Sequence, residues 1–415
     1  MGKPNVLFAT PYPLLPANSG GRMYALSTIA LLSRELDCHL IACCNAAERH
    51  ELQEASSDLL RQYHEIFKSV EFVERPTIPG EMKSRWEKTR HFALHARYGL
   101  PLMDVSYFSK QAVEAARTII RKQHIDMIEM HHLHTAFFRR FFPSLPAVLV
   151  NHNMESELWP FWPMQDGSWM EKKGWELCGR ISRKNAYRIE IENQYQFNAK
   201  FFISPIDMSR VPSDRCPLYL LPMGVQLDST PKAFRKGRFR VLWAGGLWWG
   251  PNSEAVIWFV REIWPLVQKK FSGPAEVHFV GGDPPPSLVE AHDGRTIFVH
   301  GFVPDIRPFY EEADAFIVPI RSGGGVRIKI IHALNAGIPV VATSKGCEGL
   351  PVEHEKNILV ADTAEAFADS LIRLANSLEL RQELSDNGRE YCREHHDPEK
   401  IAQTKRKVFQ AILKY

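Results

Sequence analysis

Residues 319–343 read PIRSGGGVRIKIIHALNAGIPVVAT. They predict the end of a strand, a triple-glycine loop, a helix that begins near Arg327 and Lys329, and a second buried strand. Glycines let backbone amides approach an anion closely, and the helix N-terminus behind them carries unpaired N–H groups with a partial positive charge. Two cations in the first turn strengthen that field. The stretch therefore predicts a phosphate cradle, although it lacks the Lys-Ser/Thr ending of a P-loop.

Short apolar runs alternate with helical stretches on both sides of this cradle. Runs that are apolar on both faces and linked by helices are typical of parallel sheets covered on both sides. We therefore predict an α/β fold of two tandem doubly wound, Rossmann-like domains. The expected strands are 5–9, 39–43, 70–73, 127–130, 147–151 and 201–204 in the first half, and 239–244, 275–280, 296–300, 315–319, 339–343 and 358–360 in the second. Segments such as 21–36 and 111–121 have helical periodicity.

The length of 415 residues suits two domains rather than one ordinary core. The polar and basic segment 228–238 predicts the boundary, which gives a first domain over 1–228 and a second over 229–396. Residues 397–415 have helical periodicity of their own. The segment 154–175 is rich in tryptophan, proline and methionine and is interpreted as a long loop.

The composition and the small net charge bear on the class of partner. Hydrophobic residues make up 45% and charged residues 24%, which is average for a soluble globular protein, and a net charge of +3 is too small to indicate nucleic-acid binding. Two local clusters are basic: Lys83, Arg85, Lys88 and Arg90 around Trp86, and Arg180, Arg183, Lys184 and Arg188. Such clusters are either solvated helix faces or contacts to an anionic membrane leaflet or a lipid-diphosphate acceptor.

The seven cysteines form no Cys-x-x-Cys pair, and Cys43 and Cys44 lie in an apolar run typical of small core residues. This usage indicates a reducing compartment. A strand begins almost at the N-terminus with no leader pattern, and no apolar run has the length of a membrane span. We expect a cytoplasmic protein, with peripheral membrane contact left open.

Residues 319–343 resemble the donor-site segment of family-4 glycosyltransferases, which have the GT-B fold of two Rossmann-like domains and a deep cleft between them. The resemblance implies that residues 397–415 form a C-terminal helix that packs back on the first domain. It also implies that Gly323, Gly324, Gly325, Arg327 and Lys329 hold the diphosphate of a nucleotide sugar. The family usually carries two glutamates eight residues apart, and this chain has Gly324 and His332 at the matching positions. A neutral imidazole at 332 could make one hydrogen bond to a ribose hydroxyl.

Other segments extend the resemblance to the donor site. Gly245 and Gly246, in WAGGLWWGPN, match a loop that relatives place opposite the donor phosphates, and Phe302 and Val303 match the segment beside the nucleotide base. Glu348 lies in the usual Glu-Gly-Leu after the last motif strand. Gly20 and Gly21 follow the first strand, where the family loop reaches towards the donor, although such a pair is equally typical of a simple turn.

Polar residues follow three strands of the first half. The sequence His-Asn-x-Glu-Ser after the fifth strand resembles the family loop that meets the transferred sugar, so His152 is the candidate for that contact, against the alternative of a structural histidine. Arg22, His131, His134 and Asn153 are the candidate acceptor-binding residues. The spacing of His131 and His134 could suggest a metal, but zinc signatures require more ligands, and no metal site is expected.

The resemblance implies a metal-independent, retaining hexosyltransferase with His152, Arg327 and Lys329 as catalytic residues. It would need no cofactor besides the nucleotide diphosphate sugar donor, and its acceptor would be a hydroxyl of a glycan, a lipid-linked or a small molecule. His332 leaves open a non-catalytic GT-B relative that partners another transferase. A sugar-nucleotide 2-epimerase on the same fold is a further alternative, for which no set of cleft carboxylates and histidines is evident.

Overall fold

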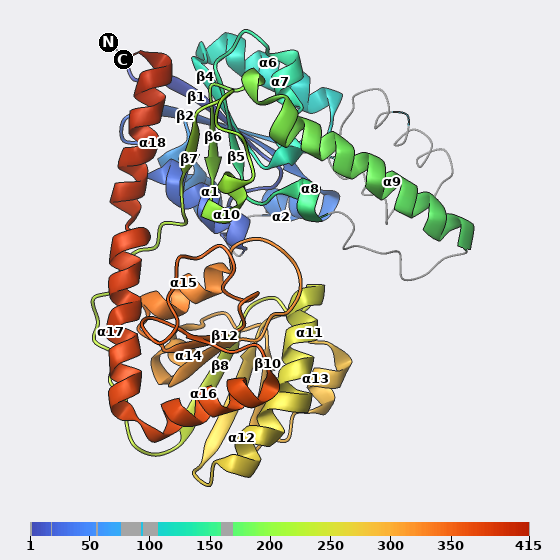
Figure 1. Ribbon diagram of the computed structural model, residues 1–415. Coiled ribbons are helices and arrows are strands. Elements are labelled where there is room, and N and C mark those ends of the chain that lie inside the picture. Colours follow the sequence, from blue (N-terminus) through green and yellow to red (C-terminus); the bar gives the residue numbers. More distant parts are fainter. Residues whose placement is uncertain are drawn as a thin grey trace. The chain divides into compact units, whose positions relative to one another are not determined.

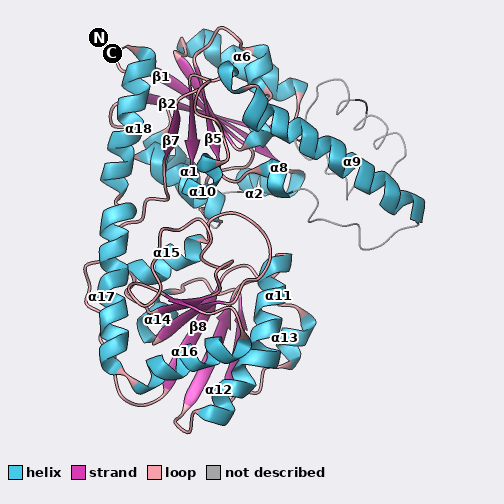
Figure 2. Cartoon of the chain, in the orientation of Figure 1, coloured by secondary structure: helices cyan, strands magenta, loops and turns pink. Residues whose placement is uncertain are grey.

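The computed structural model describes residues 2–17, 19–54, 57–75, 93, 107–158 and 169–414. The chain divides into two compact units, Met1–Gly224 with Pro398–Tyr415, and Val225–Asp397. Each unit is a parallel sheet covered by helices (Figures 1 and 2). The predicted fold class of two Rossmann-like α/β units is therefore confirmed.

The sheet of the first unit has the strand order β3-β2-β1-β4-β5-β6-β7, with parallel pairs throughout the part of the chain described. The six strands predicted for this half are confirmed as β1 to β6, with bounds that agree to within two residues at each end. The seventh was not predicted, because it has only three residues and none is fully buried. The strands are β1 Asn5–Thr10, β2 Asp37–Cys44, β3 Ser69–Glu74, β4 Met127–His131, β5 Ala147–Asn151, β6 Ala199–Phe202 and β7 Leu218–Leu220.

Helices of the first unit connect these strands. The interpretation of 154–175 as a loop is wrong at both ends, because α8 begins at Glu155 and α9 at Trp169; the residues between these helices lie outside the described part. The α-helices are α1 Gly20–Ala30, α2 Ala46–Glu54, α3 Ser57–Ile66, α6 Lys110–Gln123, α7 Phe138–Phe141, α8 Glu155–Leu158, α9 Trp169–Tyr187, α10 Pro205–Ser209 and α18 Pro398–Leu413. A π-helical turn over Arg188–Glu192 follows α9. Helix α18 packs against α1.

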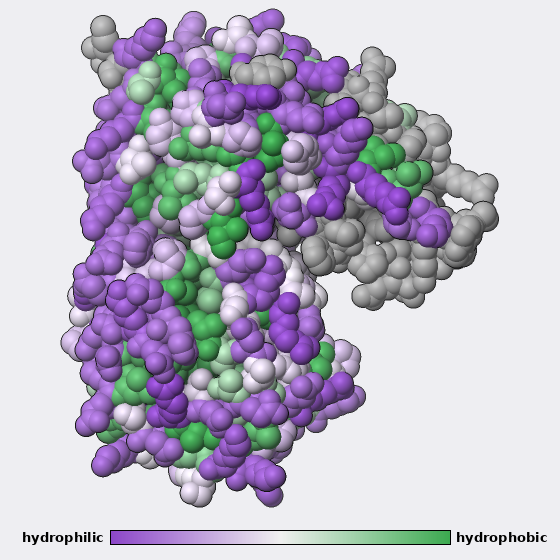
Figure 3. Space-filling model, in the orientation of Figure 1, coloured by the Kyte–Doolittle hydropathy of each residue, from purple (hydrophilic) through white to green (hydrophobic). Residues whose placement is uncertain are grey.

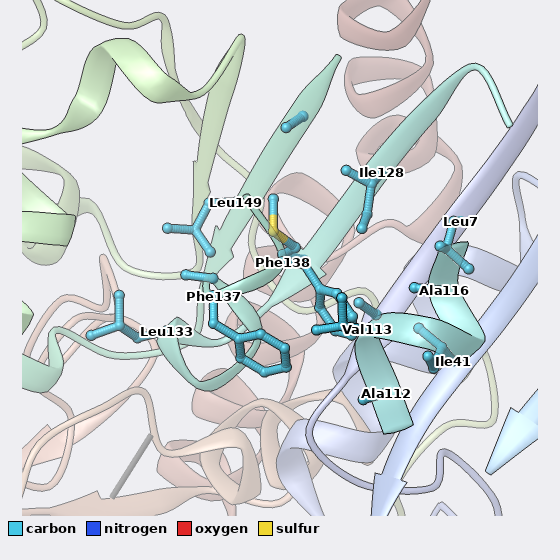
Figure 4. Packing of buried hydrophobic residues seen from close by; sticks show 14 of the residues in the cluster. Leu7, Ile41, Ala112, Val113, Ala116, Ile128, Leu133, Phe137, Phe138 and Leu149 are labelled. Atoms are coloured by element: carbon cyan, nitrogen blue, oxygen red, sulfur yellow. The ribbon is translucent and has the colours of Figure 1, made fainter. Parts of the chain in front are cut away.

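Helix α6 illustrates how the first core forms (Figure 4). Ser109 caps the helix by accepting a hydrogen bond from the Ala112 amide. Ala112 and Ala116 lie four residues apart on one helix face, and both are buried in the core cluster that includes Leu7 of β1 and Ile128 of β4. This packing holds the central strands in place, and their carboxyl ends carry the residues of interest.

The sheet of the second unit has the order β10-β9-β8-β11-β12-β13, again parallel, and its strands confirm all six predicted for this half. The strands are β8 Phe239–Ala244, β9 Ala275–Val280, β10 Ile297–Gly301, β11 Ala315–Val318, β12 Val340–Ala342 and β13 Leu359–Val360. The helices are α11 Gly250–Trp258, α12 Trp264–Lys270, α13 Pro286–Glu290, α14 Arg307–Glu312, α15 Ile328–Asn335, α16 Ala364–Asn376 and α17 Leu378–His395, with a π-helical turn over Phe259–Ile263.

The expectations about membrane contact and about the cysteines can be compared with the structure. The face drawn in Figure 3 is mostly hydrophilic, with hydrophobic residues in scattered patches. In the described part of the chain, no helix is long and apolar enough to cross a membrane. The basic cluster around Trp86 lies outside the described residues. Cys43 and Cys44 are buried free thiols, which confirms them as core residues.

Candidate functional site

The glycine loop of the second unit lies between β11 and α15, at the carboxyl end of its sheet. Ligands of doubly wound folds bind at this edge, where the loops after neighbouring strands meet. The loop after β8 lies beside it, because β8 and β11 pair directly. Helix α15 begins at Ile328, and Arg327 is its N-terminal capping residue. The loop and helix start therefore form as the sequence predicts.

Arg327 turns back onto the glycine loop. Its guanidinium donates hydrogen bonds to the carbonyl oxygens of Gly324, of Gly325 at 2.6 Å and of Ser322 at 3.2 Å. The side chain is buried, and burial lowers its pKa to about 10 despite the opposing charge of Glu348. Its Nε has no hydrogen-bond partner among the described residues. Arg327 therefore holds the shape of the loop and leaves one buried donor unused.

Lys329 lies two residues further along the chain, in the first turn of α15, with its ammonium over the indole of Trp243. The Nζ atom is 3.6 Å from the ring centroid and 3.3 Å from the amide oxygen of Asn252. Burial lowers the pKa of Lys329 well below its usual value, and the charge of Arg327 lowers it further. Across the described chain, no carboxylate forms an ion pair with it. This ammonium is held in place by neutral groups, an arrangement suited to an anion that arrives with a ligand.

Gly245 provides the space that Lys329 occupies. It adopts a φ of 139°, and a Cβ atom built on it would lie 2.7 Å from Nζ of Lys329. The next carbonyl, that of Gly246, accepts a hydrogen bond of 2.6 Å from Asn252, the residue that also contacts the lysine. The glycine pair after β8 and the cation on α15 therefore belong to one site. In the sequence, only the family resemblance indicated that they lie together.

The remaining predicted donor residues of the second unit lie at the same sheet edge or next to it. Phe302 follows β10 and is 77% exposed, whereas Val303 is partly buried. Glu348 is partly exposed and pairs with Lys345. His332 lies on α15, where burial lowers its pKa, so the ring is neutral. Its Nε2 is buried with no hydrogen-bond partner in the described residues, which leaves one polar atom for a ligand.

In the first unit, a buried chain of polar groups ends at His152. Lys405 of α18 donates to Oε1 of Glu129 at 2.7 Å, and Nε2 of His131 lies 2.7 Å from the same oxygen. Nδ1 of His131 is 3.1 Å from Nε2 of His152. Neighbouring strands create this arrangement, since Glu129 and His131 belong to β4 and His152 follows β5. Neither Glu129 nor Lys405 was a predicted site residue.

These hydrogen bonds determine which ring nitrogens of His131 and His152 carry protons. Burial alone would raise the pKa of Glu129, but Lys405 and His131 lower it below its usual value, so Glu129 is a carboxylate. It can only accept, and therefore His131 carries its proton on Nε2 and accepts through Nδ1. His152 must then donate from Nε2, because burial lowers its pKa well below the usual value and keeps it neutral. Nδ1 of His152 is left as an acceptor.

A column of aromatic rings continues from His152. The His132 ring stacks on His152 with 3.7 Å between centroids, His134 stacks on His132 at 5.6 Å, and Tyr107 stacks on His134 at 4.5 Å. The hydroxyl of Tyr12, in the loop after β1, lies 2.7 Å from Nε2 of His132. The described histidines of this edge therefore form one stacked cluster rather than separate contacts.

The other predicted residues of the first unit lie around this cluster. A Cβ on Gly21 would lie 2.1 Å from the Tyr12 hydroxyl, so this glycine at the start of α1 makes room for Tyr12. Gly20 is the first residue of the same helix. Arg22 pairs with Glu48 at 2.6 Å and is mostly buried. Asn153 is partly exposed in the turn between β5 and α8.

One group of side chains here has a geometry that could hold a metal ion. A ring nitrogen of His132, one of His134 and a carboxylate oxygen of Glu155 lie within 4.8 Å of one another. His134 was a predicted acceptor contact, whereas His132 and Glu155 were not singled out. The sequence signal available was the run His131-His-Leu-His134 followed by an acidic residue just after the next strand.

We expect the first unit to lose stability as the pH falls below about 6.5. Burial lowers the pKa values of His131, His132 and His152, so the unfolded chain takes up protons at a pH where the folded chain does not. Each such histidine should reduce the free energy of unfolding by about 1.4 kcal/mol per pH unit below that point and contribute nothing above it.

Chemical denaturation in metal-free buffer from about pH 7 to about pH 5 measures this slope. His152→Gln should reduce the dependence of the unfolding free energy on pH by the contribution of one histidine. His64→Gln, at an exposed position on α3, should leave this dependence as in the parent protein. Equal slopes in all three proteins would contradict the assignment of neutral buried histidines.

Comparison with known proteins finds relatives in sequence and in fold. Residues 238–377 match the family described as "Glycosyl transferases group 1". A protein of the cps region of Klebsiella pneumoniae is 23% identical over 94% of this chain and 95% of its own length. Sucrose-phosphate synthase from Thermosynechococcus elongatus has a similar structure, with a TM-score of 0.67 at 14% identity over 99% of both chains. The Anabaena protein HepE, solved with UDP and glucose, gives a TM-score of 0.64 at 14% identity, over 98% of this chain and 99% of its own.

The fold of both units is thus that of GT-B glycosyltransferases, and the second unit carries the family's sequence pattern over most of its length. These findings show a GT-B fold for the chain and a match of its second unit to the group 1 glycosyltransferase family.

Proposed function

We propose that this chain transfers a hexosyl group from a nucleotide diphosphate sugar to a hydroxyl acceptor with retention of anomeric configuration. The second unit would bind the donor diphosphate at the glycine loop, at Arg327 and at Lys329. His152 would accept a hydrogen bond from the transferred sugar through Nδ1. As the diphosphate leaves, these cations would stabilise its developing charge without a bound metal, by electrostatic preorganisation.

The ammonium of Lys329 carries the proposal. A desolvated cation whose contacts among the described residues are an amide oxygen and an indole face destabilises the free protein unless an anion compensates it. Arg327 adds a second cationic group with an unused buried N–H. A diphosphate offers two charges and several acceptor oxygens, whereas a carboxylate ligand would match the glycine-loop amides less completely.

His332 would contact the nucleotide ribose. Its neutral ring has an unpartnered buried nitrogen, which can exchange one hydrogen bond with a hydroxyl. The acceptor would be a glycan, a lipid-linked sugar or a small molecule, and the protein would act in the cytoplasm, in solution or at a membrane surface. The fold and the UDP–glucose complex of HepE support a sugar nucleotide as donor.

The first test is the pH dependence of diphosphate binding. Bound diphosphate should return the pKa of Lys329 towards its usual value, because an opposite charge favours the ammonium. Binding of UDP, GDP or dTDP should therefore take up a proton, and affinity should fall by up to about tenfold per pH unit above the lysine's pKa in the free protein.

Calorimetry above about pH 8, where the diphosphate no longer titrates, in two buffers of different ionisation enthalpy, measures the proton uptake. Lys329→Met should abolish it, and Lys269→Met, at an exposed position on α12, should not. If diphosphate affinity did not depend on pH and Lys329→Met left it unchanged, the assignment of the diphosphate site to Lys329 would be wrong. Diphosphate binding without transfer or hydrolysis of any donor sugar would instead identify a non-catalytic relative.

A further inference from the structure

His132, His134 and Glu155 lie together at the carboxyl edge of the first sheet. His132 directly follows β4, His134 belongs to the short 3₁₀ turn Leu133–Thr135, and Glu155 is the first residue of α8 after the neighbouring strand β5. Their candidate ligand atoms lie within 4.8 Å of one another. The proposed sugar transfer gives no role to His132 or Glu155, and His134 is only a candidate acceptor contact.

The backbone at His132 is in a region that is almost restricted to glycine. Its φ is 62° and its ψ is 158°, a combination that stores strain in a residue with a side chain. Such strain persists only where the surrounding structure over-determines it, and strained residues cluster at functional sites. The backbone conformation of His132 therefore indicates that the position of its side chain has a role of its own.

The hydrogen bonds of His132 leave one nitrogen available. Nε2 lies 2.7 Å from the Tyr12 hydroxyl, while Nδ1 is buried with no partner among the described residues. When Nε2 donates to the hydroxyl, Nδ1 carries a lone pair. Histidines that bind metals commonly donate their second N–H to an oxygen in this way, which fixes the tautomer and the ring orientation.

We propose that His132, His134 and Glu155 form a zinc site with three protein ligands. Two imidazoles and one carboxylate are a zinc ligand set that leaves a fourth position open for water or another oxygen ligand. Ligand atoms around a tetrahedral zinc ion lie about 3.4 Å apart. The partly exposed side chains of His134 and Glu155 can rotate to close the separation of up to 4.8 Å.

Glu155 supplies the negative charge of the group, and the nearest stacked rings are those of His152 and Tyr107. Two guanidinium groups lie over neighbouring rings, Arg22 at 5.9 Å from the centroid of Tyr12 and Arg75 at 5.0 Å from that of Tyr107. The ion would lie beside His152, at the edge of the first sheet. An oxygen ligand on its open position would therefore meet the proposed sugar-contacting histidine, whether or not the proposed transfer itself requires the metal.

Zinc binding to the full-length protein tests this inference without any sugar substrate. The protein is stripped with a chelator and titrated with Zn²⁺ by calorimetry, and with Co²⁺ by visible absorption, which reports the coordination geometry. We expect one equivalent to bind, and we expect Glu155→Gln and His134→Ala each to weaken binding by at least tenfold. Glu157→Gln, two residues further on α8 and exposed, is the matched control and should bind as the parent does.

Tyr12→Phe separates this site from adventitious binding elsewhere. Removing the oxygen that orients His132 should weaken zinc binding about 10- to 100-fold, the usual cost of losing such a partner. Absence of saturable binding, or binding that Glu155→Gln, His134→Ala and Tyr12→Phe all leave unchanged, would overturn the inference. Neither outcome depends on the transferase proposal, whose tests use the second unit and the nucleotide.

Discussion

Replacing Lys329 with methionine is expected to reduce sugar transfer by about 100- to 1,000-fold, the usual effect of removing one preorganised group that stabilises developing charge. The methionine keeps the volume of the buried stem over Trp243 and removes only the ammonium. Because that ammonium has a lowered pKa in the free protein, its loss should not destabilise the fold. Steady-state rates with a matched donor and acceptor, together with thermal unfolding, measure both effects.

Arg327→Met should differ from Lys329→Met in a way that the structure specifies. Arg327 also bonds three carbonyl groups of the glycine loop, so its loss should weaken nucleotide binding and lower stability as well as rate. Lys269→Met is the control for both. Unchanged rates in both variants would remove the basis for a diphosphate cradle in this loop.

Lys405→Met is expected to destabilise the protein by about 3–5 kcal/mol, because it leaves the carboxylate of Glu129 buried and uncompensated. Both partners of this ion pair are fully buried, at a distance of 2.7 Å. Denaturant unfolding measures the change, and Lys407→Met, at an exposed position of the same helix, should alter it little.

The double variant Lys405→Met, Glu129→Gln should recover most of the lost stability, since neither a buried charge nor an unpaired one remains. The glutamine oxygen can still accept the proton of His131. If the double variant is as unstable as Lys405→Met, packing of the lysine stem rather than charge compensation explains the loss. Recovery would show that charge compensation of Glu129 explains the contribution of Lys405.

Much of the fold followed from local pattern. Strands such as Ala147–Asn151 and Phe239–Ala244 were predicted residue for residue, because a short apolar run between helical segments has few other solutions in a two-sided sheet. Exceptions have local causes as well. Strand Leu218–Leu220 is too short to have a pattern. Helix Trp169–Tyr187 begins inside the segment 154–175, whose tryptophans and prolines favoured a loop, although Met170, Glu171 and Lys172 have high helix propensity.

The glycine loop with Arg327 and Lys329 could be read from the sequence alone, since a loop and the helix after it are contiguous and their chemistry is local. What each cation contacts could not be read. Lys329 contacts Trp243 of β8 and lies against Gly245 of the loop after it, and both are far from Lys329 in the sequence. Arg327 donates hydrogen bonds to carbonyl groups of the glycine loop itself.

Only the tertiary structure decided the histidine cluster. Lys405 and Glu129 are separated by 276 positions, and His131 and His152 by 21, so no spacing rule relates them. They meet because β4 and β5 are neighbours in a parallel sheet and because α18 returns to the unit that contains them. Sequence determines which groups are available at a sheet edge, whereas strand order and burial decide which of them touch, which carry protons and which remain neutral.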